Sequence, residues 1–336
     1  MVLARLLLGA TPLLGLVAIQ PMLPAPEGAP AAATATPLAQ DQEKDPDAAA
    51  TCAMCHKAFY DEWKDRAHNR AWLSPVYQAA IKEKSKPELC HACHIPDRVL
   101  DRLGKRPEVR KANHDEGITC VSCHKGSDDA IHGPFGSKTD AHPVAKDPAF
   151  SGEASVAMCN GCHSTKIGPV LPLGRDFEEA GFVKEGKTCN QCHMPVIERH
   201  LATSPVTGKP VGEKRKTRNH RILGPNDPEF CAKAFEFEAK ATEKEIVVTI
   251  TNTASHRVPG LTLRKFPVAL VVKDRDGKEH GKEVVEFSSE NELRAREVRE
   301  VKFPRAAGAD RVEVVVDHVF QDQRVATITK QTLPLE

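Results

Sequence analysis

A five-residue pattern, Cys-x-x-Cys-His, occurs five times between residues 52 and 193 and limits what this chain can fold into. The copies read CAMCH at 52–56, CHACH at 90–94, CVSCH at 120–124, CNGCH at 159–163 and CNQCH at 189–193. They contain ten of the eleven cysteines of the 336-residue chain. Because each use of paired cysteines requires its own spacing, the pattern can be tested against each use in turn.

The spacing fits the covalent attachment of c-type haem. Two thiols about one helical turn apart can add to the two vinyl groups on one edge of a porphyrin, and the histidine that follows then lies under the iron as an axial ligand. The pattern therefore predicts five covalent haem c groups. The predicted attachment residues are Cys52, Cys55, Cys90, Cys93, Cys120, Cys123, Cys159, Cys162, Cys189 and Cys192. The predicted proximal iron ligands are His56, His94, His124, His163 and His193.

Three other uses of these cysteines fit less well. Zinc sites combine two Cys-x-x-Cys knuckles, so five knuckles do not pair, and zinc does not require a histidine after each second cysteine. Thioredoxin-like dithiols lie in a βαβ pattern that is absent here. Five disulfides would suit an exported protein but would leave the five histidines unexplained. Haem attachment accounts for all fifteen residues.

The crowding of the five motifs bears on the core of this region. A domain with five porphyrins attached between residues 52 and 193 has too few residues per porphyrin to build an ordinary aliphatic core. The haems themselves must therefore form much of the core and lie close together. Only 5% of the chain is aromatic, which agrees with this view. Electrons should then pass between neighbouring haems.

The N-terminus indicates export. The sequence MVLARLLLGATPLLGLVAIQ carries one early positive charge, Arg5, followed by an uncharged run from Leu6 to Ile19 that is short for a bilayer span. Small-residue cleavage sites follow, so we expect a signal peptide over residues 1–39, cut between about residues 31 and 40, and a periplasmic protein. The alternative is an uncleaved membrane anchor. Residues 40–50 lack apolar periodicity and are expected to be a disordered leader.

After residue 234 the sequence changes to alternating apolar and polar residues, and this change determines the predicted fold class. Residues 51–230 are expected to form a mostly helical and irregular pentahaem cytochrome domain. Residues 234–336 contain seven alternating segments and the hairpin signal DRDG, which predict an immunoglobulin-like antiparallel β-sandwich. The chain is therefore predicted to be α+β with two domains. The tail carries no nucleophile, phosphate loop or metal cluster, so we expect it to give support or recognise partners.

Ten histidines remain after the five proximal ones, twice the number needed as second axial ligands. Residues 55–72, CHKAFYDEWKDRAHNRAW, predict a helix, in which His68 would lie about 18 Å from His56. Two axial nitrogens on one iron are only about 4 Å apart. If His68 binds iron, it therefore serves a haem other than the one attached at Cys52 and Cys55. The alternative is a surface histidine at the end of a helix.

The chain resembles the multihaem cytochromes of the cytochrome c-554 type over roughly residues 51–275. The resemblance lies in the segments CHKAFYDEWKDRAH, GITCVSCHKG, DAHPVAKDPAFSGEASVAMCNGCH, TCNQCHMP with RNHRILG, and EIVVTITNTASHRVPG. It implies that the four histidines at the matching positions are distal haem ligands. These are His68, His142, His220 and His256. His256 would then reach from the β domain to an iron in the haem domain.

The fifth distal ligand is less clearly marked. His132 is our candidate because the Gly-Pro that follows it predicts a sharp turn that could present its ring, and His114 and His200 are reserves. His91 is expected to face solvent or a haem propionate, and His280 is expected to be exposed. His318 lies on an apolar strand face, which favours a buried structural role. The odd cysteine, Cys231, is expected to be a small buried residue.

Electron transfer is the function that these residues favour. Closed bis-histidine irons would carry electrons between redox proteins without binding substrate, and no residue is predicted to be catalytic. The alternatives are an oxidoreductase of a small nitrogen or sulfur compound at one five-coordinate haem, and a filament of stacked subunits. The apo charge is +1, but haem propionates would make the holoprotein acidic, which favours basic redox partners, including membrane-associated complexes, and argues against nucleic acid.

Overall fold

The computed structural model describes residues 45–335. The predicted signal peptide and residues 40–44 of the predicted leader lie outside the described residues. The folded chain begins before the expected boundary at residue 51, because Ala49 starts the first helix, is 1% exposed and donates its N–H to the Glu116 carboxylate. Residues 45–50 are thus joined to the helical region by contacts that their composition did not predict.

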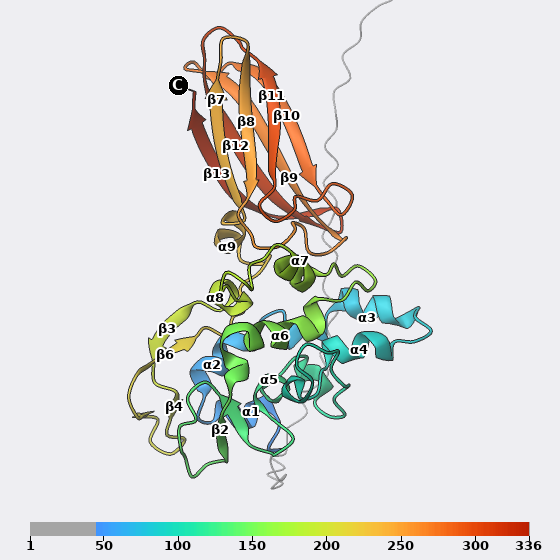
Figure 1. Cartoon of the computed structure of the whole chain (residues 1–336), viewed down its shortest axis with the longest axis vertical. Coiled ribbons are helices and arrows are strands. Elements are labelled where there is room, and N and C mark those ends of the chain that lie inside the picture. Colours follow the sequence, from blue (N-terminus) through green and yellow to red (C-terminus); the bar gives the residue numbers. More distant parts are fainter. Residues whose placement is uncertain (1–44, 336) are drawn as a thin grey trace, which may run out of the picture. The chain divides into compact units, whose positions relative to one another are not determined.

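Short helices and long irregular segments make up the described chain as far as residue 234 (Figure 1). The α-helices of this region are α1 (Ala49–Ala53), α2 (Lys57–Trp63), α3 (Pro75–Lys82), α4 (Glu88–His94), α5 (Cys120–His124), α6 (Gly152–His163), α7 (Leu173–Glu179), α8 (Cys189–His193) and α9 (Pro228–Ala232). The 3-10 helices are η1 (Asn69–Ala71), η2 (Val99–Arg102), η3 (His114–Glu116) and η4 (Pro148–Phe150). Three small two-stranded sheets contain β1 (Ile131–Gly133) with β2 (Val144–Lys146), β3 (Val196–Arg199) with β6 (Arg215–Arg218), and β4 (Ala202–Thr203) with β5 (Pro210–Val211).

The Cys-x-x-Cys-His motifs coincide with helices for local reasons. Helices α4, α5, α6 and α8 each end at the histidine of a motif. Thr119 and Thr188 precede the third and fifth motifs, and each forms a capping box with the residue three positions later. A capping box satisfies two N–H groups that the first helical turn leaves without partners. The threonine therefore fixes the start of the helix that presents each pair of thiols.

The helix predicted over residues 55–72 is shorter than expected. Helix α2 ends at Trp63, and His68 lies beyond it, just before η1. The indole N–H of Trp63 donates to the carbonyl of Ile118 at 2.8 Å, and the N–H of Ile118 donates to the carbonyl of His68 at 2.9 Å. A Cβ on Gly117 would lie 2.4 Å from the carbonyl oxygens of His68 and Asn69. Packing against this segment, distant in the sequence, turns the chain before His68.

Seven antiparallel strands follow, at the seven segments predicted from the alternating pattern (Figure 1). They are β7 (Phe235–Ala241), β8 (Glu245–Asn252), β9 (Arg264–Asp274), β10 (Glu279–Phe287), β11 (Val298–Pro304), β12 (Ala309–Phe320) and β13 (Gln323–Pro334). One sheet has the order β10-β9-β12-β13 and the other β11-β8-β7. The described region is therefore α+β, with helices first and antiparallel sheets after them.

The two sheets share one hydrophobic core. Every second residue of β8 is buried, and Ile246, Val248 and Ile250 are fully buried. These side chains belong to one cluster with Leu270 of β9 and Val314 of β12, which come from the opposite sheet. A strand that alternates in this way buries one face and leaves the other in water. The core of this part of the chain is therefore built from aliphatic and phenylalanine side chains of both sheets.

Two predictions about individual residues of this region have clear outcomes. His318 is buried, at 1% exposure, and stacks on Phe266 with ring centroids 5.3 Å apart. His280 is half-buried and not free in solvent, because its Nε2 lies 2.9 Å from a carboxylate oxygen of Asp274.

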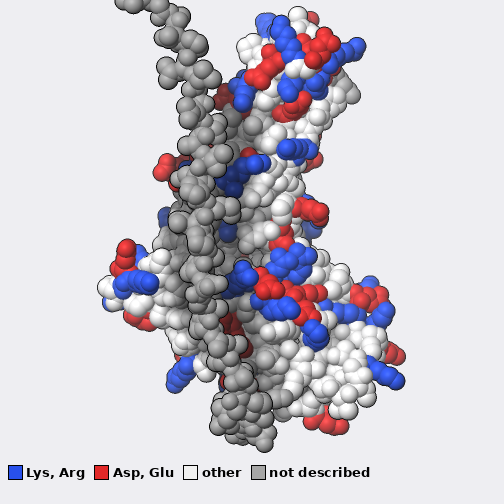
Figure 2. Space-filling view, turned by 180° about the vertical axis from the view of Figure 1, so that it is seen from behind, with Lys and Arg blue, Asp and Glu red and all other residues white. Residues whose placement is uncertain are grey.

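Lysine and arginine side chains alternate with acidic ones over the face in Figure 2, as the net charge of +1 suggests.

Candidate functional site

Four pairs of histidine rings, each from distant parts of the chain, face one another at nearly the same distance. The ring centroids are 6.3 Å apart for His56 and His142, and 6.4 Å for His163 and His68. They are 6.1 Å apart for His124 and His220, and 6.2 Å for His193 and His256. Each pair joins a proximal histidine of a motif to one of the four histidines that the family resemblance implies.

This distance is the one expected for two imidazoles on one metal ion. Metal–nitrogen bonds of about 2.0 Å on each side, with about 1.1 Å from each nitrogen to its ring centre, give a centroid separation of about 6.2 Å. Rings stacked directly face to face would be closer, as the 3.6 Å between Tyr77 and His94 shows. The residues present therefore fit a central ion, and haem iron is the ion that the adjacent thiols indicate.

Hydrogen bonds at the other ring nitrogen set the tautomer. The Nδ1–H groups of His56, His124 and His193 donate to backbone carbonyls at 2.8, 2.8 and 2.6 Å. Those of His220 and His256 do the same at 2.9 and 2.8 Å. Since a carbonyl can only accept, Nδ1 carries the proton and Nε2 is left with a free lone pair, which is the state of a metal-ligating imidazole.

Burial keeps the distal rings neutral. Desolvation, with a smaller effect of the nearby His163, lowers the pKa of His68 to about 4. Desolvation, with a smaller effect of His124, lowers the pKa of His220 to about 3. Only a neutral imidazole has a lone pair for iron, so both rings are ready to bind at neutral pH.

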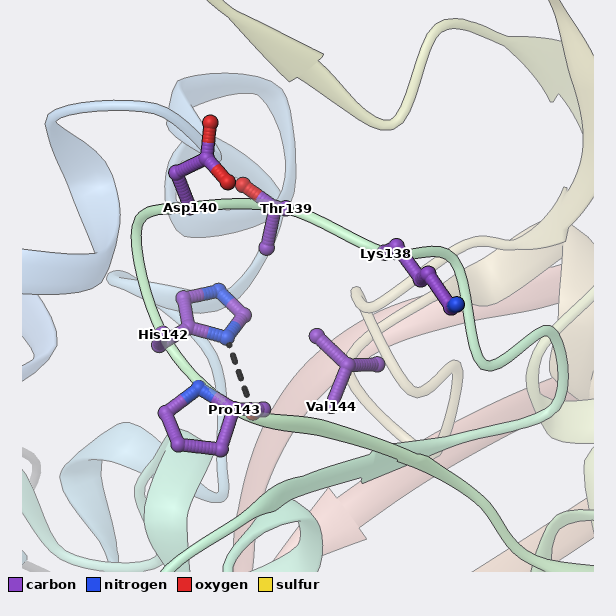
Figure 3. Close-up of a pocket in the computed structure, with 6 residues that line it drawn as sticks. All are labelled: Lys138, Thr139, Asp140, His142, Pro143 and Val144. Carbon is purple, nitrogen blue, oxygen red and sulfur yellow. Dashed lines mark hydrogen bonds between the residues drawn. The ribbon is translucent and has the colours of Figure 1, made fainter.

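His142 occupies the most open of the four positions. It is half-buried and lines an open hollow of about 350 Å³ between residues 138 and 144 (Figure 3). Its Nδ1 lies 3.2 Å from the carbonyl oxygen of Pro143, so the turn at His-Pro orients the ring. The proximal partner, His56, is fixed by the carbonyl of Leu201. The haem attached at Cys52 and Cys55 would therefore lie near the surface.

The second motif differs from the other four. No second histidine ring among residues 45–335 lies at the pair distance from His94. Its Nδ1–H donates to the carbonyl of Ala71 at 2.6 Å, as for the other proximal residues. The ring of Tyr77 stacks on it instead, with centroids 3.6 Å apart and planes 8° apart. Tyr77 is 7% exposed, and its hydroxyl has no partner within the described chain. The sequence analysis did not single out Tyr77, and no motif marks it.

The candidates for a fifth distal ligand lie elsewhere. His132 has Asp128 2.9 Å from Nε2 and Asp147 2.7 Å from Nδ1, so both ring nitrogens are engaged. Its carbonyl accepts the Nδ1–H of His124, which makes it a support of the third motif.

The reserve candidates and His91 also lack a facing proximal ring. His114 donates from Nε2 to the carbonyl of Arg110, and His200 from Nδ1 to that of Gly212. His91 is half-buried and lies against Trp72 with ring centroids 5.0 Å apart. The described part of the chain thus brings four of the five distal candidates opposite a proximal ring, and His132 is the exception.

The thiols of different motifs also lie close together. Cys120 contacts Cys52, and this contact, with burial, raises the pKa of the Cys120 thiol. Contact with Cys93, with burial, likewise raises the pKa of Cys162. Cys159 meets Cys189 in the same way. The first motif therefore adjoins the third, the second adjoins the fourth, and the fourth adjoins the fifth.

The sandwich supplies His256 and holds it from both sides. Asn252, at the end of β8 and 2% exposed, donates from Nδ2 to the carbonyls of His256 and Leu293 at 3.0 and 2.8 Å. The neighbouring Arg257 pairs with Asp176 of α7, with Nη2 2.6 Å from a carboxylate oxygen, and with Glu292. The loop that presents His256 is thus tied to both parts of the described chain.

A second ion pair holds the distal His220. Arg199 of β3 pairs with Glu62 of α2 through both terminal nitrogens at 2.8 and 2.9 Å, and both side chains are largely buried. The Glu62 carboxylate also accepts a hydrogen bond from the backbone N–H of His220 at 2.8 Å. Phe59 lies between these groups, with the Arg199 guanidinium 3.7 Å above its ring and the His220 ring at its edge.

Comparisons with known proteins bear on this arrangement. Residues 51–125 match the family described as "Cytochrome c554 and c-prime". A second match is to the multiheme cytochrome MtrA of Shewanella baltica, which is 25% identical over 160 residues, 46% of this chain and 38% of MtrA. The match thus spans much less than two thirds of that relative. The chain is a multihaem c-type cytochrome.

A solved structure supports the fold of this cytochrome over most of its length. The penta-heme cytochrome c552 from Thermochromatium tepidum superposes with a TM-score of 0.62, over 86% of this chain and 99% of that one, at 18% identity. The helical region and the antiparallel sheets therefore occur together in another cytochrome. No helix within residues 45–335 of the present one is long and apolar enough to span a bilayer.

Proposed function

We propose that this cytochrome is an exported pentahaem electron carrier in which four haems have two histidine ligands. The observation that carries the proposal is the set of four histidine pairs with centroids 6.1–6.4 Å apart. Haem, when bound, supplies one-electron redox chemistry at each motif. The chain's own contribution is to hold two neutral imidazoles on each of four irons, which leaves no open position there for a substrate.

The four ligand pairs are proposed as His56 with His142, His68 with His163, His124 with His220, and His193 with His256. The thiols of each motif would hold one porphyrin, as predicted from the spacing. Five motifs support a count of five haems, and the penta-heme cytochrome of similar fold supports the same count. Contacts between thiols of different motifs favour short distances between neighbouring haems.

The haem attached at Cys90 and Cys93 supports a second candidate function. His94 has Tyr77 against its ring and faces no second imidazole within residues 45–335. A haem with one protein ligand could bind a small nitrogen or sulfur compound, so this motif is the proposed location of any reductase or oxidase activity. The other four haems would then supply its electrons.

The sheets in the C-terminal part favour an immunoglobulin-like sandwich. The strand orders β11-β8-β7 and β10-β9-β12-β13 place seven strands in two sheets, as in an immunoglobulin-like domain. The fourth strand, β10, pairs with the third, β9, whereas in the constant-type immunoglobulin domain the fourth strand pairs with the fifth. Its proposed role is to present His256 and to fix it through Asn252 and Arg257. The proposed haem domain covers the predicted residues 51–230 and is extended by residues 45–50, which contact it. The proposed second domain covers residues 234–336, and the signal peptide covers residues 1–39.

Redox proteins are the proposed partners. Propionates would give the whole holoprotein a negative charge, which favours partners with basic surfaces over much of its face. Electron transfer in the periplasm agrees with the predicted signal peptide.

The haem count and the electron capacity test this proposal. The intact mass of the purified holoprotein should correspond to five haems, and a reductive titration should take up five electrons per chain. Cys231→Ala should leave both numbers unchanged, because Cys231 lies outside the motifs. Cys189→Ala should impair attachment at the fifth motif. A holoprotein with fewer than five haems, or one whose haems are not reduced by a small reductant, would contradict the proposal.

A further inference from the structure

Two segments near the pair of His56 and His142 are rich in positive charge. The first, residues 134–146, contains the distal candidate His142. The second, residues 205–216, follows β4 directly. We call these two segments together the basic rim. It contains six cations against the two carboxylates of Asp140 and Glu213, a local excess of four positive charges. The six cations are Lys138, Lys146, Lys209, Lys214, Arg215 and Lys216.

The two segments of the basic rim form one surface. Arg215 donates to the hydroxyl of Ser137 at 2.8 Å, and its guanidinium lies 5.3 Å from the ring centre of Phe135. The second segment follows β4, and Thr203 of β4 donates its N–H to the carbonyl of Cys55 at 2.8 Å. Since the first segment contains His142 and the second begins two residues after this contact with the first motif, the rim lies beside the pair of His56 and His142.

The cations of the rim are available to a partner. All six are exposed. No hydrogen bond or ion pair to another described residue engages the side chain of any of the five lysines. Apolar side chains lie among them, since Val206 is 91% exposed, Val211 53% and Phe135 37%. A small apolar patch bordered by charges of one sign is suited to a transient interface, in which charge guides the encounter and a limited area allows rapid release.

We propose that the basic rim is the docking surface for an acidic redox protein, which exchanges electrons with the haem attached at Cys52 and Cys55. This inference rests on the proposed electron-carrier function. One electron leaves the partner's reduced centre and converts one ferric haem to ferrous, or the reverse. The charge of the rim is opposite to that expected for the holoprotein as a whole, so partners of opposite charge would meet different haems of the same chain. One end of the haem series is thereby assigned to an acidic partner.

The test is the reduction of the oxidised holoprotein by a reduced plant-type ferredoxin, an acidic iron–sulfur protein, followed by stopped-flow absorbance. The variant reverses three charges in the rim, Lys209→Glu, Lys214→Glu and Lys216→Glu. The matched control reverses three exposed lysines of the sandwich, Lys278→Glu, Lys282→Glu and Lys330→Glu. Electrostatic steering changes association rates by roughly 10- to 1000-fold, and salt screens it.

We expect the rim variant to react at least about tenfold more slowly than the wild type at low ionic strength, with the difference nearly lost at about 0.5 M salt. The control should react like the wild type. Equal rates for the rim variant and the wild type would overturn the inference, as would an equal loss in the control. Reduction by dithionite separates the two proposals, because a holoprotein that dithionite does not reduce fails as an electron carrier, whatever the rim does.

Discussion

The ion pair between Arg257 and Asp176 gives a quantitative test of how the sandwich holds His256. The side chains of Arg257, Asp176 and Glu292 are 20%, 11% and 21% exposed. The change Arg257→Met keeps an apolar stem of similar length but leaves two largely buried carboxylates without their cation. Removing one partner of a fully buried pair costs about 3–5 kcal/mol, and the partial exposure here reduces this to about 2–3 kcal/mol.

This loss should act on the equilibrium between bound and released His256. Since about 1.4 kcal/mol corresponds to a factor of ten, the released fraction should rise roughly 30- to 150-fold. An exogenous ligand binds only the released state, so its apparent affinity for this haem should rise by the same factor. The assay is an optical titration of the ferric holoprotein with cyanide.

Two further variants make the result specific. Asp176→Asn should produce a similar gain in cyanide affinity, and the double variant should show much less than the sum of the two effects, because both changes remove one interaction. Arg299→Met is the control, since Arg299 pairs with Glu297 within the sandwich and has a similar partial exposure. Unchanged cyanide affinity in Arg257→Met, or an equal gain in Arg299→Met, would refute the proposed role of the ion pair.

Three further outcomes follow from particular side chains. His256→Ala should convert one haem to high spin in the optical spectrum, whereas His200→Ala, at a half-buried ring outside the four pairs, should not; an unchanged spectrum for His256→Ala would exclude its ligation. Arg199→Met leaves Glu62 without its cation, so the EPR g-values or the potential of one low-spin haem should shift and Arg199→Lys should restore part of the shift; identical spectra would reduce Arg199 to a packing role. Burial, with the nearby Arg264, lowers the pKa of His318 to about 4 from about 6.5. The unfolded state therefore takes up a proton that the folded state resists, and the wild type should lose about 3 kcal/mol of stability between pH 6.5 and pH 4. In denaturant titrations His318→Leu should lose less stability over this range, and parallel pH profiles for the two proteins would contradict a role for His318.

The sequence predicted the parts of this cytochrome that depend on local pattern. Alternation marks the strands because each strand buries one face. The thiol spacing predicts haem attachment because the porphyrin edge imposes that spacing, and this remains a prediction. The four distal candidates came from the family resemblance, and the structure brings each of them to a proximal ring. His68 faces His163 and not His56, as its distance from His56 along the chain suggested.

The parts that the sequence did not predict depend on long-range contacts. The end of α2 before His68 depends on Ile118, fifty residues away in the chain. His132 looked able to reach an iron because of the turn after it, but Asp147 approaches from another segment and, with the local Asp128, occupies both ring nitrogens. The ring of Tyr77 stacks on the ring of His94 through packing alone. No motif in the neighbouring sequence predicts this contact.

Spin quantitation of the oxidised holoprotein by low-temperature EPR counts the irons with two histidine ligands. We expect four low-spin ferric haems per chain, one for each histidine pair, and one high-spin ferric haem from the second motif that changes when cyanide is added. Five low-spin signals that ignore cyanide would contradict the open position at His94. More than one high-spin haem per chain would contradict the four histidine pairs.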